Sequence, residues 1–213
     1  MKKIIYFLSF ILVLIGCQEV IKEIPNEVVK ITEPEVQLNG KYYSLKNQPI
    51  KIFLPSTFVA LERHEVLKIA QNLEDAYSKE KWVSQIEFLI QSKIPSFYYH
   101  APELGAFLSI YLEDNVQLDK QTASYFLGVI QKKHEEIYFN QRVLYTKIDS
   151  RFKSNDQIKI VKSVYELTHA ENKDFLSYYH LYLINYKNKL YFFELETPEL
   201  IDYEPYVLKT TVL

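Results

Sequence analysis

The 213-residue sequence contains one cysteine, four glycines and no excess of basic residues. A single cysteine excludes an intramolecular disulfide framework and a cysteine-rich zinc finger. Four glycines leave little material for a loop that cradles phosphate groups, and no dinucleotide-binding, Walker or nucleophile-elbow motif is present. The formal net charge of −2 gives no basic surface of the kind that nucleic-acid binding needs. The sequence therefore predicts no nucleic-acid partner and no nucleotide cofactor.

Apolar and aromatic residues are abundant instead. Hydrophobic residues make up 48% of the chain and aromatic residues 15%, including 18 tyrosines and 13 phenylalanines. This composition is too apolar for a disordered chain, and the length suits one domain or two small ones.

The first sixteen residues have the pattern of a secretory signal peptide. Lys2 and Lys3 precede an apolar run, Ile4–Ile15, of twelve residues. As a helix this run would span about 18 Å, whereas a bilayer core is about 30 Å thick. A signal peptide over 1–16 is therefore favoured over a stable spanning helix.

The signal ends in Leu14-Ile15-Gly16-Cys17, which resembles the lipobox of bacterial lipoproteins. The resemblance implies cleavage before Cys17 and a diacylglycerol on its thiol, so that the membrane is the first expected partner. An uncleaved anchor helix that contains Cys17 stays open as an alternative. Gln18 follows, whereas lipoproteins retained at the inner membrane of many Gram-negative bacteria resemble one another in having Asp there. We therefore expect export to the cell envelope and anchoring at the outer membrane, on a side that the sequence does not specify.

Residues 17–37 are interpreted as the lipidated cysteine and a flexible tether. They contain Pro25, Pro34 and five glutamates, and they have no aromatic residue. A first strand at Glu27–Ile31 is the alternative. A single domain is expected over 38–213.

The first half of this domain predicts alternating strands and helices. Asn39-Gly40 predicts a turn between short strands at 36–38 and 42–45, and a further strand ends at Pro55. Apolar spacing predicts one helix from near Glu62 to Tyr77. The stretch 82–90 fits a helix or a strand, and a strand is favoured at its end.

The second half predicts a strand at 106–113 and a helix over 119–137 with Asp119 as its N-cap. Pro198 is expected to end the last strand, and a short helix to follow from Glu199. Four long strands precede them, with a hairpin turn at Asn188: Arg142–Lys153, Ile158–Thr168, Leu176–Tyr186 and Leu190–Thr197. This order predicts an α+β fold in which α-helices cover an antiparallel β-sheet.

Two segments resemble PsbP/Mog1-like domains. They are Pro49–Pro55, which is followed by a helix, and the run Tyr179–Leu195 with its Thr197-Pro198 and Tyr203-Glu204-Pro205 tail. The resemblance covers residues 40–213 and lies in pattern. It implies the fold and a binding character, and no functional residue carries over from it.

No catalytic or metal-binding motif is found. Glu194 and Glu196 share one strand face near a strand end, where solvent is expected, so general acid–base catalysis is not predicted. No pair of histidines has the spacing of H-E-x-x-H. The five histidines are His64, His100, His134, His169 and His180. We expect no catalytic residue, no metal and no cofactor.

Tyr178, His180 and Tyr182 alternate along one strand and so share a face. One interpretation is a hydrogen-bonded histidine in or beside the core, and the other is an aromatic binding surface. We therefore expect a lipid-anchored, non-catalytic module that binds an envelope protein or assists assembly. The alternative is a carrier of a small apolar ligand held between the sheet and the helices.

Overall fold

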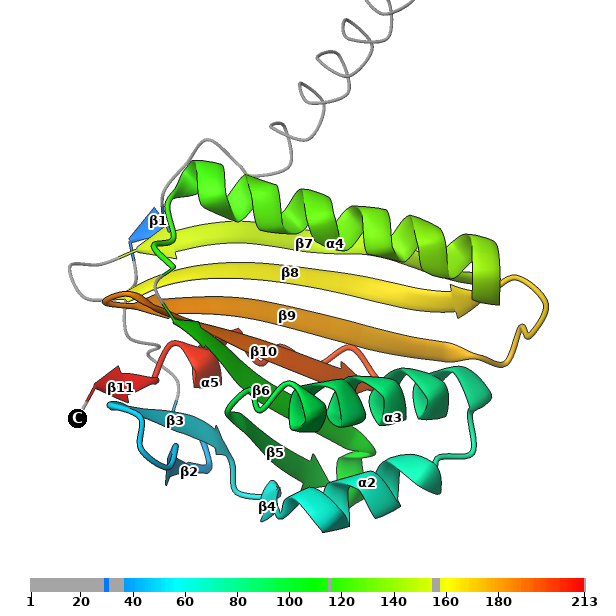
Figure 1. Ribbon diagram of the computed structural model, residues 1–213, viewed down its shortest axis with the longest axis horizontal. Coiled ribbons are helices and arrows are strands. Elements are labelled where there is room, and N and C mark those ends of the chain that lie inside the picture. The colour runs from blue at the N-terminus through cyan, green and yellow to red at the C-terminus, as the bar shows by residue number, and fades with distance from the viewer. Residues whose placement is uncertain (1–28, 31–36, 115, 155–157, 213) are drawn as a thin grey trace, which may run out of the picture.

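The computed structural model of the protein describes residues 29–30, 37–114, 116–154 and 158–212 (Figure 1). The expected signal peptide, Cys17 and most of the expected tether lie outside these ranges. Within them, no helix combines the length and the apolar character that crossing a membrane requires.

The larger of two sheets has eight strands in the order β1-β7-β8-β9-β10-β6-β5-β4. Neighbouring strands are antiparallel, except that β1 is parallel to β7. The strands are β1 (Val29–Lys30), β4 (Val59–Leu61), β5 (Ser96–Ala101), β6 (Ala106–Asp114), β7 (Val143–Ser154), β8 (Ile158–His169), β9 (Leu176–Tyr186) and β10 (Lys189–Thr197).

The two faces of this sheet carry different layers (Figure 1). Three helices cover one face: α2 (Arg63–Gln71), α3 (Ala76–Gln91) and α4 (Lys120–Gln141). The other face is covered by the helix α5 (Glu204–Val207) and by a three-stranded sheet of order β11-β3-β2. Its strands are β2 (Gly40–Ser44), β3 (Ile50–Pro55) and β11 (Thr211–Val212), and a 3-10 turn, η2 (Pro102–Leu104), links β5 to β6.

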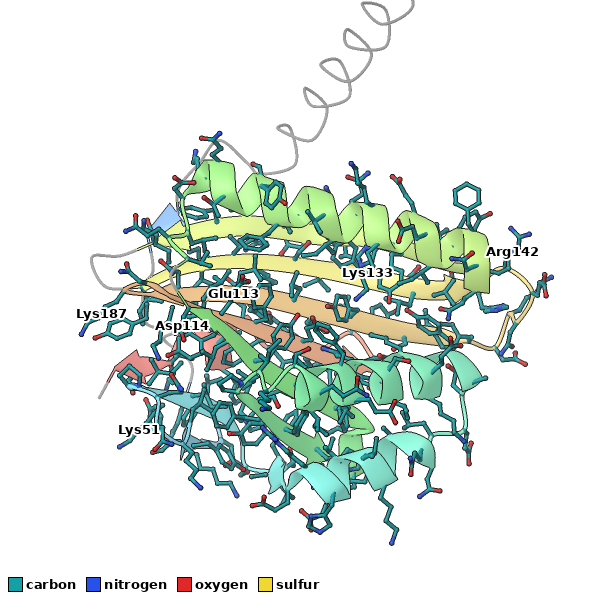
Figure 2. The ribbon with its side chains drawn as sticks, viewed as in Figure 1. Lys51, Glu113, Asp114, Lys133, Arg142 and Lys187 are labelled. Atoms are coloured by element: carbon teal, nitrogen blue, oxygen red, sulfur yellow. The ribbon has the colours of Figure 1, made fainter. Side chains whose placement is uncertain are left out.

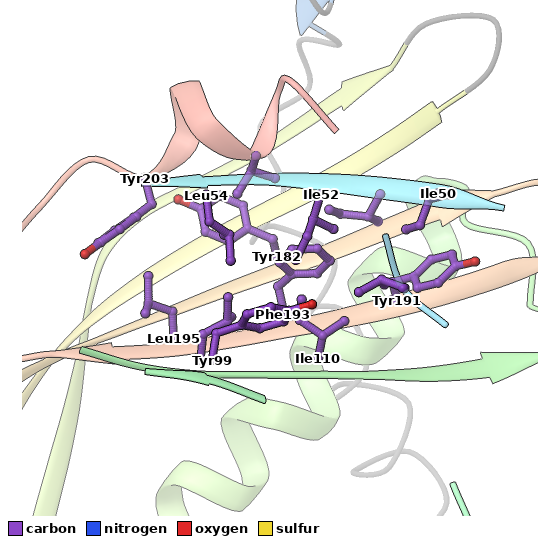
Figure 3. Close-up of a cluster of buried hydrophobic side chains, with 14 of the residues drawn as sticks. Ile50, Ile52, Leu54, Tyr99, Ile110, Tyr182, Tyr191, Phe193, Leu195 and Tyr203 are labelled. Atoms are coloured by element: carbon purple, nitrogen blue, oxygen red, sulfur yellow. The ribbon is translucent and has the colours of Figure 1, made fainter. Parts of the chain in front are cut away.

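The central strand β9 is buried on both faces from Tyr179 to Tyr186. Tyr179 and Leu181 pack in the core beneath α4. Tyr182 and Ile184 belong to the core beneath the small sheet, where Figure 3 shows Tyr182 among side chains of β3 and β10. A layer on each face explains why burial does not alternate along this strand, which also contains the buried polar residues His180 and Asn185. The predicted α+β fold with an antiparallel sheet under helices is confirmed.

The small sheet corrects the turn predicted at Asn39-Gly40. Gly40 begins β2, which pairs with β3, and the connecting loop contains Asn47 with φ of 61°. A Cβ atom at Gly40 would lie 2.5 Å from the carbonyl oxygen of Leu54. This glycine therefore permits the close approach of two strands. An Asn-Gly pair in the sequence does not show whether its glycine serves in a turn or in such a close contact.

The helix predicted over 62–77 is two helices. Glu62 and Glu65 form a capping box at the start of α2. Asp75 then starts α3 afresh, because its carboxylate accepts a hydrogen bond of 2.7 Å from the backbone N–H of Ser78. Since α3 continues to Gln91, the strand favoured at the end of 82–90 is wrong.

The remaining elements agree with the prediction in part. The predicted N-cap of α4 is confirmed, since the Asp119 carboxylate accepts a hydrogen bond of 2.7 Å from the backbone N–H of Thr122. In contrast, the last helix begins at Glu204 and not at Glu199, and the strands β4 and β5 were not predicted. The short strand β1 matches part of the open alternative at Glu27–Ile31.

Candidate functional site: a groove between two helices

Helices α3 and α4 lie apart on the same face of the sheet, and a hollow of about 440 Å³ lies between them (Figure 1). We call this hollow the helix groove. Its walls include Tyr77, Lys81 and Ser84 from α3 and Ile130, His134 and Ile137 from α4.

Aromatic side chains from four strands form much of the floor of the helix groove. They are Tyr145 of β7, Tyr179 of β9, Phe192 of β10 and Tyr111 of β6. Tyr111 and Phe192 are direct cross-strand partners, and their rings stack at 4.8 Å with an angle of 4°. The rings of Tyr145 and Tyr179 meet edge to face at 5.9 Å. Strand register fixes the first pair and ring packing across β8 holds the second, so the floor is preformed.

The α4 wall is tied to the floor by His134. Its ring stacks on Tyr145 with a centroid distance of 3.8 Å, and the Tyr145 hydroxyl hydrogen-bonds that of Tyr77 on α3. Burial, together with the positive charges of Lys81 and Lys133, lowers the pKa of His134 to about 3. The imidazole is therefore neutral at pH 7 and offers one donor and one acceptor nitrogen. Figure 2 shows Lys133 on α4.

The α3 wall holds a buried ion pair between Lys81 and Glu196, with 2.8 Å between the ammonium nitrogen and the carboxylate. The ammonium also lies 4.3 Å from the centre of the Tyr179 ring. Burial alone would lower the pKa of Lys81, but the charge of Glu196, with smaller contributions from Tyr77, raises it above its ordinary value. Lys81 therefore stays charged beside the floor.

Glu196 is held by four side chains in all. Besides Lys81, the hydroxyls of Ser78 and Ser177 donate to it at 2.9 and 3.1 Å, and the indole N–H of Trp82 donates at 3.0 Å. Burial would raise the pKa of this carboxyl, but Lys81 and these hydrogen bonds lower it below its ordinary value. A carboxylate that stays ionised is a poor general acid at neutral pH.

Glu194 lies two residues earlier on the same strand and is also buried. It accepts hydrogen bonds from the hydroxyl of Tyr111 at 2.5 Å and from the amide of Gln85 at 2.9 Å. The prediction that Glu194 and Glu196 face solvent is wrong, because α3 covers this end of β10. Lys81 and Gln85 lie four residues apart and so share the face of α3 that contacts the two glutamates, but no local sequence pattern indicates which strand lies opposite that face.

A second hollow of about 600 Å³ lies beside the start of α3 and reaches Glu196 from the other side. Ser78, Trp82 and Ser177 line it, and their polar atoms are used in holding Glu196. The Lys81–Glu196 pair thus lies between the two hollows, since Lys81 lines the helix groove and Glu196 lines the second hollow. More aromatic side chains line the helix groove than the second hollow.

The residues predicted as a binding surface lie on the opposite face of the sheet. His180 and Tyr182 are each 1% exposed, and Tyr178 is half-buried. The ring of Tyr203, the N-cap residue of α5, packs against His180. The prediction that these three residues share one face of a strand is correct. That face is covered by the protein's own chain, while Tyr179 of the same strand faces the helix groove.

His180 fits the alternative interpretation of a core histidine. Its Nε2 lies 3.4 Å from the hydroxyl of Thr197, and burial, followed by the charge of Lys162, lowers its pKa to about 4. Lys162 pairs with Glu204 at 2.8 Å on the same face and fastens α5 to the sheet. In the described part of the chain, no three metal-ligating side chains come together.

Comparison with known proteins identifies the fold. No family model matches the sequence, and no curated protein does either. Among solved structures, the fold is similar to the solution structure of cyanobacterial PsbP (CyanoP) from Synechocystis sp. PCC 6803, with a TM-score of 0.50 and 11% identity. The match covers 85% of this chain and 97% of that one. The domain is therefore PsbP-like in fold, and at this identity the likeness extends no further.

Proposed function

We propose that the protein is a lipid-anchored cell-envelope protein whose PsbP-like domain is a non-catalytic module for protein binding or assembly, with the helix groove as its binding site. The observation that carries this proposal is a hollow between two helices whose floor is formed by packed aromatic rings. Tyrosine is enriched among the residues that dominate protein interfaces, because a rigid ring gives contact area and a hydroxyl gives direction.

The rim of the helix groove supports a protein as the occupant. Phe88 of α3 lines the rim and is 60% exposed. A partner that inserts a side chain between α3 and α4 would bury this ring as well. Its polar atoms could reach Lys81 and His134, which lie on opposite walls.

Two matched variants test the site. Ser84→Trp fills the helix groove from an exposed position of α3, whereas Glu87→Trp places the same bulk on an exposed position that does not line it. In affinity capture from envelope membranes, we expect Ser84→Trp to lose a partner that Glu87→Trp and the unmodified protein retain. Equal recovery of every bound protein by both variants would contradict the proposed site.

The lipid anchor rests on the resemblance of Leu14–Cys17 to a lipobox, and Gln18 supports the outer membrane. Cys17→Ala removes the thiol that would carry the diacylglycerol. We expect this variant to lose labelling by a radioactive fatty acid and to leave the membrane fraction. Labelling that persists in Cys17→Ala would refute the anchor.

A carrier of a small apolar ligand is the second candidate. The helix groove lies between sheet and helices, and its volume of about 440 Å³ falls within the range of small-molecule sites. Native mass spectrometry of protein purified from its envelope distinguishes the two candidates. A bound mass of a few hundred daltons that Ser84→Trp displaces would favour the carrier.

A further inference from the structure

Five exposed residues form one stripe along the outer side of α4. Positions 125, 129, 132, 136 and 139 are spaced by four, three, four and three residues, so their side chains follow one another along one side of the helix. These residues are Tyr125, Val129, Lys132, Glu136 and Phe139, and all five are exposed. We call them the α4 stripe.

The α4 stripe faces away from the sheet. His134, whose ring stacks on Tyr145 of β7, lies nine residues after Tyr125. Nine residues are about two and a half helical turns, so His134 and Tyr125 point in opposite directions from the helix axis. No layer of described residues lies outside α4 (Figure 1). The stripe is therefore open to a partner from outside the domain, on another side of α4 than the helix groove.

Large apolar side chains occupy both ends of the α4 stripe. Tyr125 is 67% exposed and Val129 48% exposed at one end, and Phe139 is 73% exposed at the other. Exposed apolar side chains that gather on one surface are typical of sites that bind another molecule.

The middle of the α4 stripe carries one charge of each sign. Within the described part of the chain, neither Lys132 nor Glu136 takes part in an ion pair. Both charges are therefore available to an outside partner that presents the opposite order of charges.

A reversed copy of α4 presents that order. Positions 132 and 136 are equally far from position 134, and so are positions 129 and 139. Two antiparallel α4 helices related by a twofold axis at position 134 therefore place Lys132 of each copy level with Glu136 of the other. The same axis places Val129 level with Phe139. A parallel pair would instead bring like charges together at both positions.

The outer end of the stripe fits the same arrangement. Tyr125 is nine residues from position 134, which places it level with position 143 of a reversed copy, next to Leu144. There a hollow of about 250 Å³ lies beside the end of α4, and Tyr138, Phe139 and Leu144 line it. The exposed ring of Tyr125 from one copy would thus lie beside this hollow of the other.

We propose that the α4 stripe is the interface of a homodimer in which two copies pack their α4 helices antiparallel about a twofold axis at position 134. A second copy is favoured over another partner because the charges and the apolar ends of the stripe are complementary to the same stripe reversed, as a twofold interface requires. The rings supply most of the contact, and the charges set direction and register. The inference does not depend on the lipid anchor, and the helix groove stays open in the dimer.

Charge reversal tests this interface. Lys132→Glu or Glu136→Lys, present in both copies, puts like charges opposite each other in the antiparallel pair. When a copy with Lys132→Glu meets a copy with Glu136→Lys, one helix carries two acidic residues and the other two basic residues at these positions. Both pairs are then opposite in sign again. Because both positions are exposed, we expect the circular dichroism of each variant to equal that of the unmodified protein.

Association is measured between two full-length copies that carry different affinity tags, are co-expressed and are solubilised from the envelope. One tag is used for capture and the other for quantification. We expect unmodified copies to be captured together, and each variant paired with itself to be recovered at least about fivefold less. The mixed pair of Lys132→Glu with Glu136→Lys should return to the unmodified level, a result that only contact between two copies of this helix produces.

A matched pair of apolar variants tests the rings. We expect Phe139→Ser to lower joint capture at least about fivefold, whereas Leu200→Ser, at a 55% exposed position outside α4, should leave it unchanged. Absence of joint capture for the unmodified copies would overturn the homodimer. So would equal recovery of all charge combinations, a mixed pair that is not restored, or equal recovery of the two serine variants.

Discussion

Lys81 and Glu196 connect the stability of the domain to its candidate site. Removing two charges from water costs several kcal/mol per ion, and their attraction offsets this only with good geometry and further hydrogen bonds. Both conditions are met, since the pair is 2.8 Å apart and the Glu196 carboxylate also accepts hydrogen bonds from Ser78, Ser177 and Trp82. The pair thus fixes α3 against β10 and sets one wall of the helix groove.

Replacing Lys81 by methionine should therefore be costly. Lys81→Met leaves Glu196 buried without its cation, and we expect the free energy of unfolding to fall by about 3–5 kcal/mol. The double variant Lys81→Met, Glu196→Gln should recover much of this loss, because it leaves no unpaired charge. Urea denaturation measures both, with the exposed Lys79→Met as control. A loss in Lys81→Met no larger than in the control would show that the pair does not hold α3.

Acid should weaken the same contact. The folded-state pKa of Glu196 lies below its ordinary value of 4.5. Its ionisation therefore stabilises the fold above pH 4.5, and this contribution disappears as the pH falls through the lowered pKa. We expect the difference in unfolding free energy between the protein and Glu196→Gln to be constant from pH 6 to about 8 and to shrink below about pH 4.5. Chemical denaturation across this range, with Glu199→Gln as an exposed control, checks the expected slope.

Individual residues were the hardest to place from the sequence. Long-range contacts such as the hydrogen bond between Tyr111 and Glu194 join positions 83 residues apart, and no local sequence pattern indicates them. His180 shows the same limit, because alternation indicates which residues share its face but not which layer covers that face.

At the scale of elements, long periodic segments were predictable and short ones were not. The strands β8 and β9 were found within one residue of their bounds. β4 has only three residues, too few to display a period. The break between α2 and α3 was missed because apolar spacing runs across it, although Asp75 is an ordinary N-cap residue.

The cap at Asp75 supports the α3 wall of the helix groove. Asp75→Ala removes the acceptor for the backbone N–H of Ser78, and we expect a loss of about 1 kcal/mol in unfolding free energy. Thermal unfolding followed by circular dichroism measures this, with the adjacent exposed Glu74→Ala as control. Identical melting curves for the two variants would show that the cap does not limit the stability of α3.

In the small sheet, Gly40 is the residue on which the packing of β2 against β3 depends. Gly40→Ala puts a methyl group 2.5 Å from the carbonyl oxygen of Leu54 and 2.7 Å from the ring of Phe53. We expect β2 to be displaced, with a loss of about 1–3 kcal/mol. Ser44→Ala, at an exposed position of the same strand, should be nearly neutral in the same denaturation measurement. A neutral Gly40→Ala would mean that β2 moves without cost.

At the scale of the whole molecule, the fold class followed from the order of strands and helices, and the helix groove did not. The groove exists because α4 and α3 stand apart on one sheet face, with the largely buried rings of Tyr179 and Phe192 lining the space between them. That separation is set by strand order, which places β8, β9 and β10 between β7 and β6. Only the assembled sheet shows which tyrosines of an aromatic-rich chain lie beneath the groove.

The central claim is that the helix groove binds a protein at the membrane, and photo-cross-linking in intact envelopes tests it most directly. A benzophenone amino acid is introduced at Ser84, which lines the groove, and at Glu87, which does not. The account predicts a discrete protein adduct from position 84 that is absent from position 87. The same adducts from both positions, or none from position 84, would contradict it.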